Sequence, residues 1–268
     1  MPETPAFAAA THVVSRGDGT FGVEIPDGWD IVGNVDGGLL LALLGRAVTA
    51  ATGRPDPVTV TGHYLRPGRS GPATVATEVL KEGKRFSTAR ATLRAGDGDV
   101  VTSLATTGTL DSDPGEPIHL AGSPPDLPPV DECELLVGTD GFPPTFMDRV
   151  EVRLHPEDAG FIRGEPTGVP LLRGWFRLRD GEPIDSIGLL LAVDSFPPTI
   201  FNASLPFGWT PTVELTAHLR ARPAPGWLAC SFATRFITGG FLEVDGEVWD
   251  AHGDLVAQSR QLALVPRG

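Results

Sequence analysis

The stretch GLLLA at residues 38–42 recurs unchanged at residues 188–192. Each copy is followed first by an Arg-Pro pair and then by a Gly-Asp turn. The pairs begin at Arg66 and Arg222, and the turns begin at Gly98 and Gly253. The copies lie 150, 156 and 155 residues apart, so the order survives with small loop insertions. The two halves therefore share one plan, and two similar units of this kind usually pack against each other around a pseudo-twofold axis.

The composition indicates an ordered globular protein. At 268 residues the chain is long enough for two units. The net charge of −13 repels polyanions, so we expect no nucleic-acid partner and no anionic membrane surface. The two cysteines, Cys133 and Cys230, form no CxxC motif, which argues against a metal site and fits a reducing compartment. Without a signal-peptide pattern or a membrane-length apolar run, we expect a cytoplasmic protein.

Glycines and prolines divide the first half into one helix and several strands. Gly37-Gly38 opens an apolar run of good helix formers at residues 39–51, which ends before Gly53. The flanking segments alternate or carry β-branched residues between Gly-rich turns, a pattern typical of antiparallel strands. These segments are residues 11–15, 21–25, 58–65, 73–81, 85–94 and 100–108. The first half is predicted as two strands, a helix and four further strands.

Residues 111–145 form the predicted boundary between the halves. The segment carries eight prolines and several acids, which excludes a regular helix or a central strand. The second half repeats the plan, with a helix predicted at residues 184–195. Its predicted strands are residues 146–154, 171–179, 212–219, 226–236, 241–250 and 255–265. We therefore expect units at residues 1–110 and 146–268, joined by this proline-rich linker.

A helix wrapped by a long antiparallel sheet, repeated in tandem, is the double-hotdog arrangement of the α+β class. The chain resembles the acyl-CoA thioesterase II group, whose members have this fold. The matching strings are GG at 37–38, RPG at 66–68, EGKRFS at 82–87, PT at 211–212, RP at 222–223 and GDLVAQSRQ at 253–261. The resemblance covers nearly the whole chain outside the linker and implies hydrolysis of acyl-CoA thioesters.

The resemblance also implies a catalytic set in the second half. In that group an Asp on the second helix works with a Thr or Ser on the next strand and a Gln on the last strand. The matching residues are Asp194, Thr212 and Gln261, and Thr210 or Thr216 could take the place of Thr212 after a small shift in alignment. Thioester hydrolysis needs a base for water, groups that hold the water, and N–H donors for the oxyanion. Asp194 would be the base.

Gly37 and Gly38 are predicted to bind substrate at the start of the first helix. The amide of Gly38 could donate to the thioester carbonyl, because a helix N-terminus carries a partial positive charge. The related group usually has His before the two glycines, whereas this chain has Asp36. An acid here repels an oxyanion if it points inward, and it caps the helix if it points away.

Arg66 and Arg85 are the predicted contacts for the nucleotide of coenzyme A. Together with Arg69, Lys81 and Lys84 they form the densest basic grouping of an acidic chain. Arginine and lysine bind the phosphates that coenzyme A carries. A strand edge protected by charged side chains is an equally consistent interpretation.

The predicted function is hydrolysis of an acyl-CoA to free acid and coenzyme A by Asp-activated water, without a metal or other cofactor. Two alternatives stay open. The first is a non-catalytic hotdog protein that binds acyl thioesters. The second is a hotdog enoyl-CoA hydratase, but the Asp-x5-His spacing at Asp113 and His119 falls in the linker. The length of the acyl chain and the formation of a homo-oligomer are not decided by the sequence.

Overall fold

The computed structural model describes residues 7–113, 115, 117–137, 145–205 and 208–266. One 14-stranded sheet runs through both halves. The strands of the first half are β1 (Val14–Ser15), β2 (Thr20–Ile25), β5 (Asp56–Tyr64), β6 (Gly71–Glu82), β7 (Ser87–Ala95) and β8 (Gly98–Gly108). Those of the second half are β9 (Glu134–Leu135), β10 (Val150–Leu154), β11 (Leu171–Leu178), β12 (Thr212–Leu219), β13 (Leu228–Ala233), β14 (Ile237–Thr238), β15 (Phe241–Trp249) and β16 (Leu255–Leu264). A separate small hairpin pairs β3 (Asp30–Ile31) with β4 (Asn34–Val35).

The described helices are few and mostly short. The α-helices are α1 (Phe7–Ala10), α2 (Gly37–Thr52) and α3 (Gly188–Ala192). The 3-10 helices are η1 (Val130–Glu132), η2 (Thr145–Asp148), η3 (Pro156–Asp158), η4 (Gly160–Arg163) and η5 (Thr199–Asn202). None of the helices in the described part of the chain is long and apolar enough to cross a bilayer.

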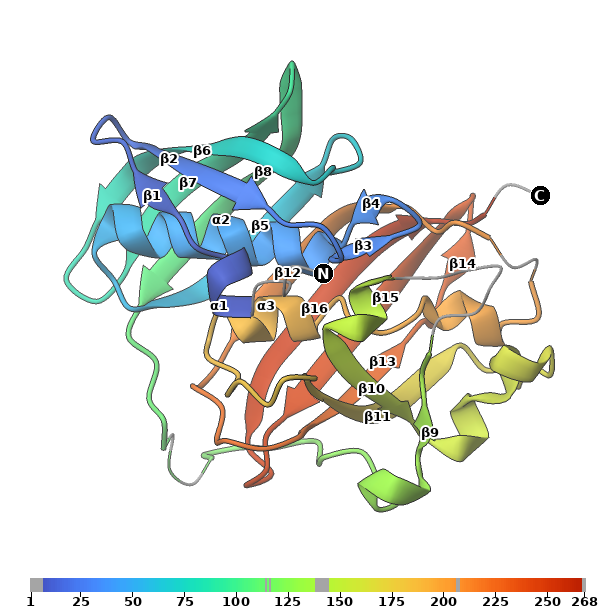
Figure 1. The fold of residues 1–268 in the computed structure, drawn as a ribbon. Coiled ribbons are helices and arrows are strands. Elements are labelled where there is room, and N and C mark those ends of the chain that lie inside the picture. The colour runs from blue at the N-terminus through green and yellow to red at the C-terminus, as the bar shows by residue number, and fades with distance from the viewer. Residues whose placement is uncertain (1–6, 114, 116, 138–144, 206–207, 267–268) are drawn as a thin grey trace.

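The two halves of the sheet join edge to edge. The strand order is β1-β2-β6-β7-β8-β5-β12-β16-β15-β13-β11-β10-β9, with antiparallel pairing, and β14 pairs with β15. The junction is the pair β5–β12, where Thr61 lies opposite Thr216 and their hydroxyl oxygens are 2.9 Å apart. Figure 1 shows the blue-to-green strands of the first half continuing into the yellow-to-red strands of the second. The prediction of a double hotdog is confirmed, and the sheets of its two units form one continuous antiparallel sheet.

The central helix α2 forms where the sequence predicts it. Asp36 is its N-cap and accepts a hydrogen bond from the backbone N–H of Leu39 at 2.9 Å. Gly53 ends the helix with φ 63°, a left-handed conformation that glycine adopts without steric cost. The leucines of the GLLLA copy are buried, and α2 packs against β5 to β8 on one side and against α3 on another.

The second helix is much shorter than the predicted residues 184–195. Regular α-helix covers only Gly188–Ala192, and the chain continues in tight turns through Asp194. Asp185 caps the start, because its carboxylate accepts from the backbone N–H of Gly188 at 2.8 Å. Pro197 and Pro198 then prevent continuation, since proline has no backbone N–H to donate. The apolar run is buried as expected, but as little more than one turn of helix.

Within the described residues of 111–145, regular structure is limited to η1, β9 and the start of η2. The strand β9 adds two residues to the outer edge of the sheet by pairing with β10. This agrees with the expectation that the prolines exclude a helix or a central strand. The division of the chain into units at 1–110 and 146–268 stays a prediction, because the sheet itself is continuous.

Candidate active site

A cavity of about 550 Å³ lies where the two halves meet. Its polar end is lined by Asp36, Gly37 and Tyr64 from the first half and by Asp194 and Gln261 from the second, with Thr212 beside them. The rest of the wall is largely apolar and rich in rings. The aromatic residues that line it are Tyr64, Phe146, Phe161, Phe196, Phe201, Trp209 and Phe232. A cavity with a few polar groups at one end of an apolar wall is the usual form of a small-molecule site.

The structure brings Asp194, Thr212 and Gln261 together from separate elements. Asp194 follows α3, Thr212 begins β12, and Gln261 lies in β16. The Nε2 of Gln261 donates to Oδ1 of Asp194 at 3.1 Å and to Oγ1 of Thr212 at 2.5 Å. Because β12 and β16 are paired neighbours, the amide of Gln261 can reach both side chains at once. These contacts fix the orientation of the Asp194 carboxylate.

The hydrogen bonds also distinguish Thr212 from the other threonines nearby. Thr212 is the threonine that contacts Gln261. The hydroxyl of Thr210 donates to the carbonyl of Gly208 at 3.3 Å. Thr216 lies at the sheet junction, where it donates to Glu214 and contacts Thr61. The geometry therefore favours Thr212 as the third member of the group.

Asp194 is poised to exchange a proton near neutral pH. Burial raises the pKa of Asp194 to about 7, while hydrogen bonds from Gln261 and from the backbone N–H of Gly38 oppose the rise. The side chain is half-buried, because it faces the cavity rather than bulk solvent. A carboxylate with such a pKa can accept a proton from water at physiological pH and later return it.

Gly37 and Gly38 allow α2 to approach Asp194 closely. A Cβ on Gly37 would lie 2.5 Å from Oδ2 of Asp194, and a Cβ on Gly38 would lie 2.9 Å from the carbonyl oxygen of Leu191. Both positions therefore require glycine for packing. The N–H of Gly38 lies near the carboxylates of Asp194 and Asp36 and lowers the pKa of each, and its role as a donor to substrate stays a prediction.

Tyr64 is a site residue that the sequence analysis missed. Its hydroxyl donates to the carbonyl of Gly37 at 2.9 Å, and its ring lies against the Gly37 backbone beside Asp194. Burial and the charge of Asp194 raise the pKa of Tyr64 well above its ordinary value, so it stays a donor. The sequence offered one signal for this residue. Tyr64 is the single tyrosine of the chain and lies two residues before Arg66, which begins the first Arg-Pro pair.

The two predicted nucleotide contacts are separated in space. Arg66 lines the cavity at its rim, where its half-exposed guanidinium lies over Gly98 and pairs with the exposed Asp97 at 3.3 Å. Arg85 is not among the lining residues. It lies in the β6–β7 hairpin over Phe86, and that hairpin contacts Arg54 just beyond the C-terminal end of α2. The site begins at the opposite end of this helix, about 24 Å away. Arg85 therefore lies outside the cavity lining, and its contact with the nucleotide of coenzyme A stays a prediction.

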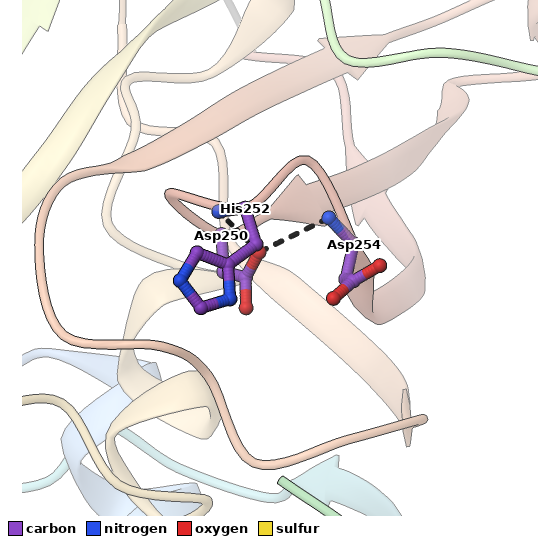
Figure 2. A group of neighbouring side chains, drawn as sticks. All are labelled: Asp250, His252 and Asp254. Atoms are coloured by element: carbon purple, nitrogen blue, oxygen red, sulfur yellow. Dashed lines mark hydrogen bonds between the residues drawn. The ribbon is translucent and has the colours of Figure 1, made fainter. Parts of the chain in front are cut away.

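Asp250, His252 and Asp254 offer potential metal ligands within 4.8 Å of one another. Figure 2 shows these three side chains. The Asp250 carboxylate already has another role. It accepts from the backbone N–H groups of Ala224, His252 and Asp254 at 2.9 to 3.0 Å and so shapes the β15–β16 turn. This accounts for the buried acid without a metal, and the group lies outside the cavity lining.

Comparison with known proteins agrees with this fold. Residues 25–108 match the family model of the acyl-CoA thioesterase N-terminal domain, and residues 124–265 match that of the acyl-CoA thioesterase C-terminal domain. The chain therefore belongs to the acyl-CoA thioesterase family. An uncharacterized protein of Mycobacterium tuberculosis is 31% identical, with 91% of this chain and 90% of that protein covered.

Solved structures give the same result. A Thermobifida fusca protein described as a thioesterase II has a TM-score of 0.89 and 37% identity, with 100% of this chain and 99% of that chain covered. A hot dog fold protein from Alicyclobacillus acidocaldarius has a TM-score of 0.87 and 22% identity, with 99% and 100% covered, and shows the fold alone.

Proposed function

We propose that this protein hydrolyses acyl-CoA thioesters to free acid and coenzyme A, with Asp194 as the base that activates water. The observation that carries the proposal is the hydrogen-bonded group of Asp194, Gln261 and Thr212 at the polar end of an apolar cavity. Membership of the acyl-CoA thioesterase family supports the reaction class. The site supplies a base and polar groups for water, and the proposed reaction needs no cofactor.

The roles follow from the hydrogen bonds. The Thr212 oxygen accepts from Gln261, so the Thr212 hydroxyl keeps its own proton to donate. A water that donates to the Asp194 carboxylate can accept from this hydroxyl and still have a lone pair for attack. Gln261 holds Asp194 and Thr212 in position, and its own carbonyl oxygen can accept the second water proton.

The substrate would lie with its thioester at this polar end. The ring-rich wall suits a neutral, apolar acyl group, because a charged one would lose its hydration without gaining a partner there. Arg66 at the rim suits the phosphates of coenzyme A, since its pair with the exposed Asp97 is weak and easily exchanged.

The test is release of coenzyme A from a series of straight-chain and aromatic acyl-CoAs, alongside calorimetric binding of a non-hydrolysable acyl-CoA analogue. We expect release, with analogue affinity that depends on the acyl group. An Arg66→Glu variant serves as a matched probe of the rim and should raise KM more than it lowers kcat. Binding without release for every substrate would favour the non-catalytic binding protein instead.

A further inference from the structure

Two carboxyl groups, those of Asp36 and Asp194, lie at the polar end of the cavity. Asp36 lines the cavity, and only 2% of it is exposed. The carboxyl of Asp36 accepts from the N–H of Leu39 at 2.9 Å. A Cβ on Gly37, the residue that follows Asp36, would lie 2.5 Å from Oδ2 of Asp194, and the N–H of Gly38 lies near both carboxyls. The two carboxyls therefore lie close together in a place with little water.

The surroundings of this pair determine which member carries the charge. The titratable groups near Asp36 are Asp194 after α3 and Tyr64 at the end of β5, and Tyr64 in turn lies near Glu214 in β12. None of the ion pairs among the described residues includes Asp36 or Asp194. Two adjacent buried carboxyls without a cation cannot both ionise.

Asp194 is the member of the pair that ionises first. It accepts a hydrogen bond from the side chain of Gln261, which favours its charged form. Asp36 is more deeply buried. Burial, together with the charge on Asp194, raises the pKa of Asp36 well above its ordinary value. At neutral pH Asp36 therefore keeps its proton.

Hydrolysis of a thioester also needs a donor for the oxyanion that develops on the carbonyl oxygen. The Gly38 amide is the expected donor, but it lies beside two carboxyls that also attract its N–H. An un-ionised carboxylic acid in an apolar site can donate a strong hydrogen bond to such an oxygen. We propose that Asp36 acts as an un-ionised acid whose O–H donates to the thioester carbonyl oxygen. This inference rests on the proposed thioesterase function.

The reaction is balanced without any further reactant. Water attacks the carbonyl carbon, its proton passes to the Asp194 carboxylate, and the C=O π electrons move to the oxygen, which accepts from Asp36. When the C=O bond re-forms, the C–S bond breaks and its electron pair leaves on the sulfur of coenzyme A. The thiolate takes the proton from Asp194. Asp36 donates a hydrogen bond throughout and keeps its proton.

Two substitutions at Asp36 separate the donor from the helix cap. Asp36→Asn retains an N–H donor and a good N-cap acceptor but cannot ionise, and Asp36→Gly removes the donor while glycine is still tolerated at an N-cap. We expect Asp36→Asn to lower kcat by less than about tenfold and Asp36→Gly to lower it by about 10²–10³-fold, the usual loss for one oxyanion donor. Analogue affinity should change little in either variant.

The matched control is Asp185→Gly, which removes the hydrogen bond to the N–H of Gly188 and the ion pair with Arg46, away from the cavity, and should keep wild-type kcat. Melting temperatures of all three variants separate loss of folding from loss of the donor. A second readout is the pH dependence of kcat/KM. In Asp36→Asn, the acid limb of this profile, which reports the ionisation of Asp194, should have the same pKa as in the wild type. A neutral Asp36 carries no charge that could shift the pKa of Asp194.

Three results would overturn the proposal. The first is an equal loss of kcat in Asp36→Asn and Asp36→Gly, and the second is a wild-type kcat in Asp36→Gly. The third is a lower pKa for the acid limb of kcat/KM in Asp36→Asn, which would show that Asp36 is ionised in the wild type. Failure of the proposed function looks different, since the wild type itself would then release no coenzyme A.

Discussion

At the residue scale, two opposing effects set the pKa of Asp194. Burial disfavours its charge, whereas Gln261 and the Gly38 amide stabilise it, and the resulting pKa is about 7. A base must be unprotonated to accept a proton from water. We therefore expect kcat/KM to rise with pH through about 7 and then to level. A pH–rate profile measured from pH 5 to 9 checks this, and a flat profile across that range would exclude Asp194 as the base.

The same raised pKa affects stability. The folded protein resists ionisation of Asp194, so this residue contributes stability that is fully present below its unfolded pKa of about 3.8 and is lost as pH rises through 7. Asn cannot ionise and keeps the acceptor for Gln261. Asp194→Asn should therefore be more stable than wild type at pH 8 by roughly 1–3 kcal/mol, with the gain shrinking toward pH 5.

Denaturant unfolding at pH 5 and pH 8 measures this difference directly. Thr212→Val provides a comparison, because it changes a polar group of the same site without removing a titratable one. Its effect on stability should not depend on pH in this range. An Asp194→Asn variant whose stability difference from wild type is the same at both pH values would contradict the burial of this carboxylate.

Single residues also show which features of the candidate site can be predicted from the sequence and which cannot. Asp194, Thr212 and Gln261 follow from a family resemblance, because each occupies a recognisable string. The contacts of Tyr64 and the buried position of Asp36 do not, since both depend on how α2 packs against the turn after α3. A helix cap is readable from sequence, but whether it also lines a cavity is set by tertiary packing.

At the scale of elements, glycines spaced seven residues apart on α2 let it lie against α3. A Cβ on Gly38 would meet the carbonyl oxygen and Cα of Leu191 at 2.9 and 3.0 Å. A Cβ on Gly45 would meet the tip of the Leu190 side chain at 2.6 Å, and that tip can rotate away. The two glycines therefore differ in how much an added methyl group costs.

We expect Gly38→Ala to destabilise the protein by about 1–3 kcal/mol, because backbone rather than a side chain must move. Gly45→Ala is the matched control on the same helix. It should stay within about 1 kcal/mol of wild type, since the better helix propensity of alanine offsets the contact. Thermal unfolding of both variants measures the comparison. Equal stability of the two would show that the close contact at Gly38 can relax freely.

The elements themselves were largely predictable, because alternating residues and Gly-rich turns mark strands such as β12, whose predicted bounds match the structure. The length of α3 was not. Its apolar run reads as a twelve-residue helix, yet packing against α2 buries it as five helical residues followed by turns. The short α1 was missed as well, since four residues carry too little periodicity.

At the scale of the whole molecule, a buried ion pair connects the halves. Asp56 at the start of β5 accepts from Nε and Nη2 of Arg222 at 2.9 and 2.8 Å, and from Ser186 and the N–H of Leu110. Burial alone would raise the pKa of Asp56, but Arg222 and these donors hold it below its ordinary value. Such a group adds stability above its unfolded pKa, which is lost as pH falls through the folded pKa.

Arg222→Ala leaves the Asp56 carboxylate buried without its cation. Because Arg222 is itself half-exposed, we expect a loss of about 1–3 kcal/mol, less than for a fully buried pair. The difference in stability between this variant and wild type should shrink as pH falls below about 4, because Asp56 is then protonated in both and the ion pair is lost from wild type as well. The control is Arg94→Ala, which removes an exposed pair with Asp99 and should leave the melting temperature unchanged. Identical acid titrations for Arg222→Ala and wild type would contradict this account.

The central claim is that Asp194 activates water for thioester hydrolysis, and release of coenzyme A by Asp194→Asn tests it most directly. The variant keeps the shape and the acceptor for Gln261 but lacks the basic carboxylate. We expect a fall in kcat of about 10²–10⁴-fold with analogue affinity nearly unchanged. Gln261→Ala should lose less, because Gln261 positions the water and does not accept its proton. Release by Asp194→Asn at a rate close to wild type would contradict the central claim.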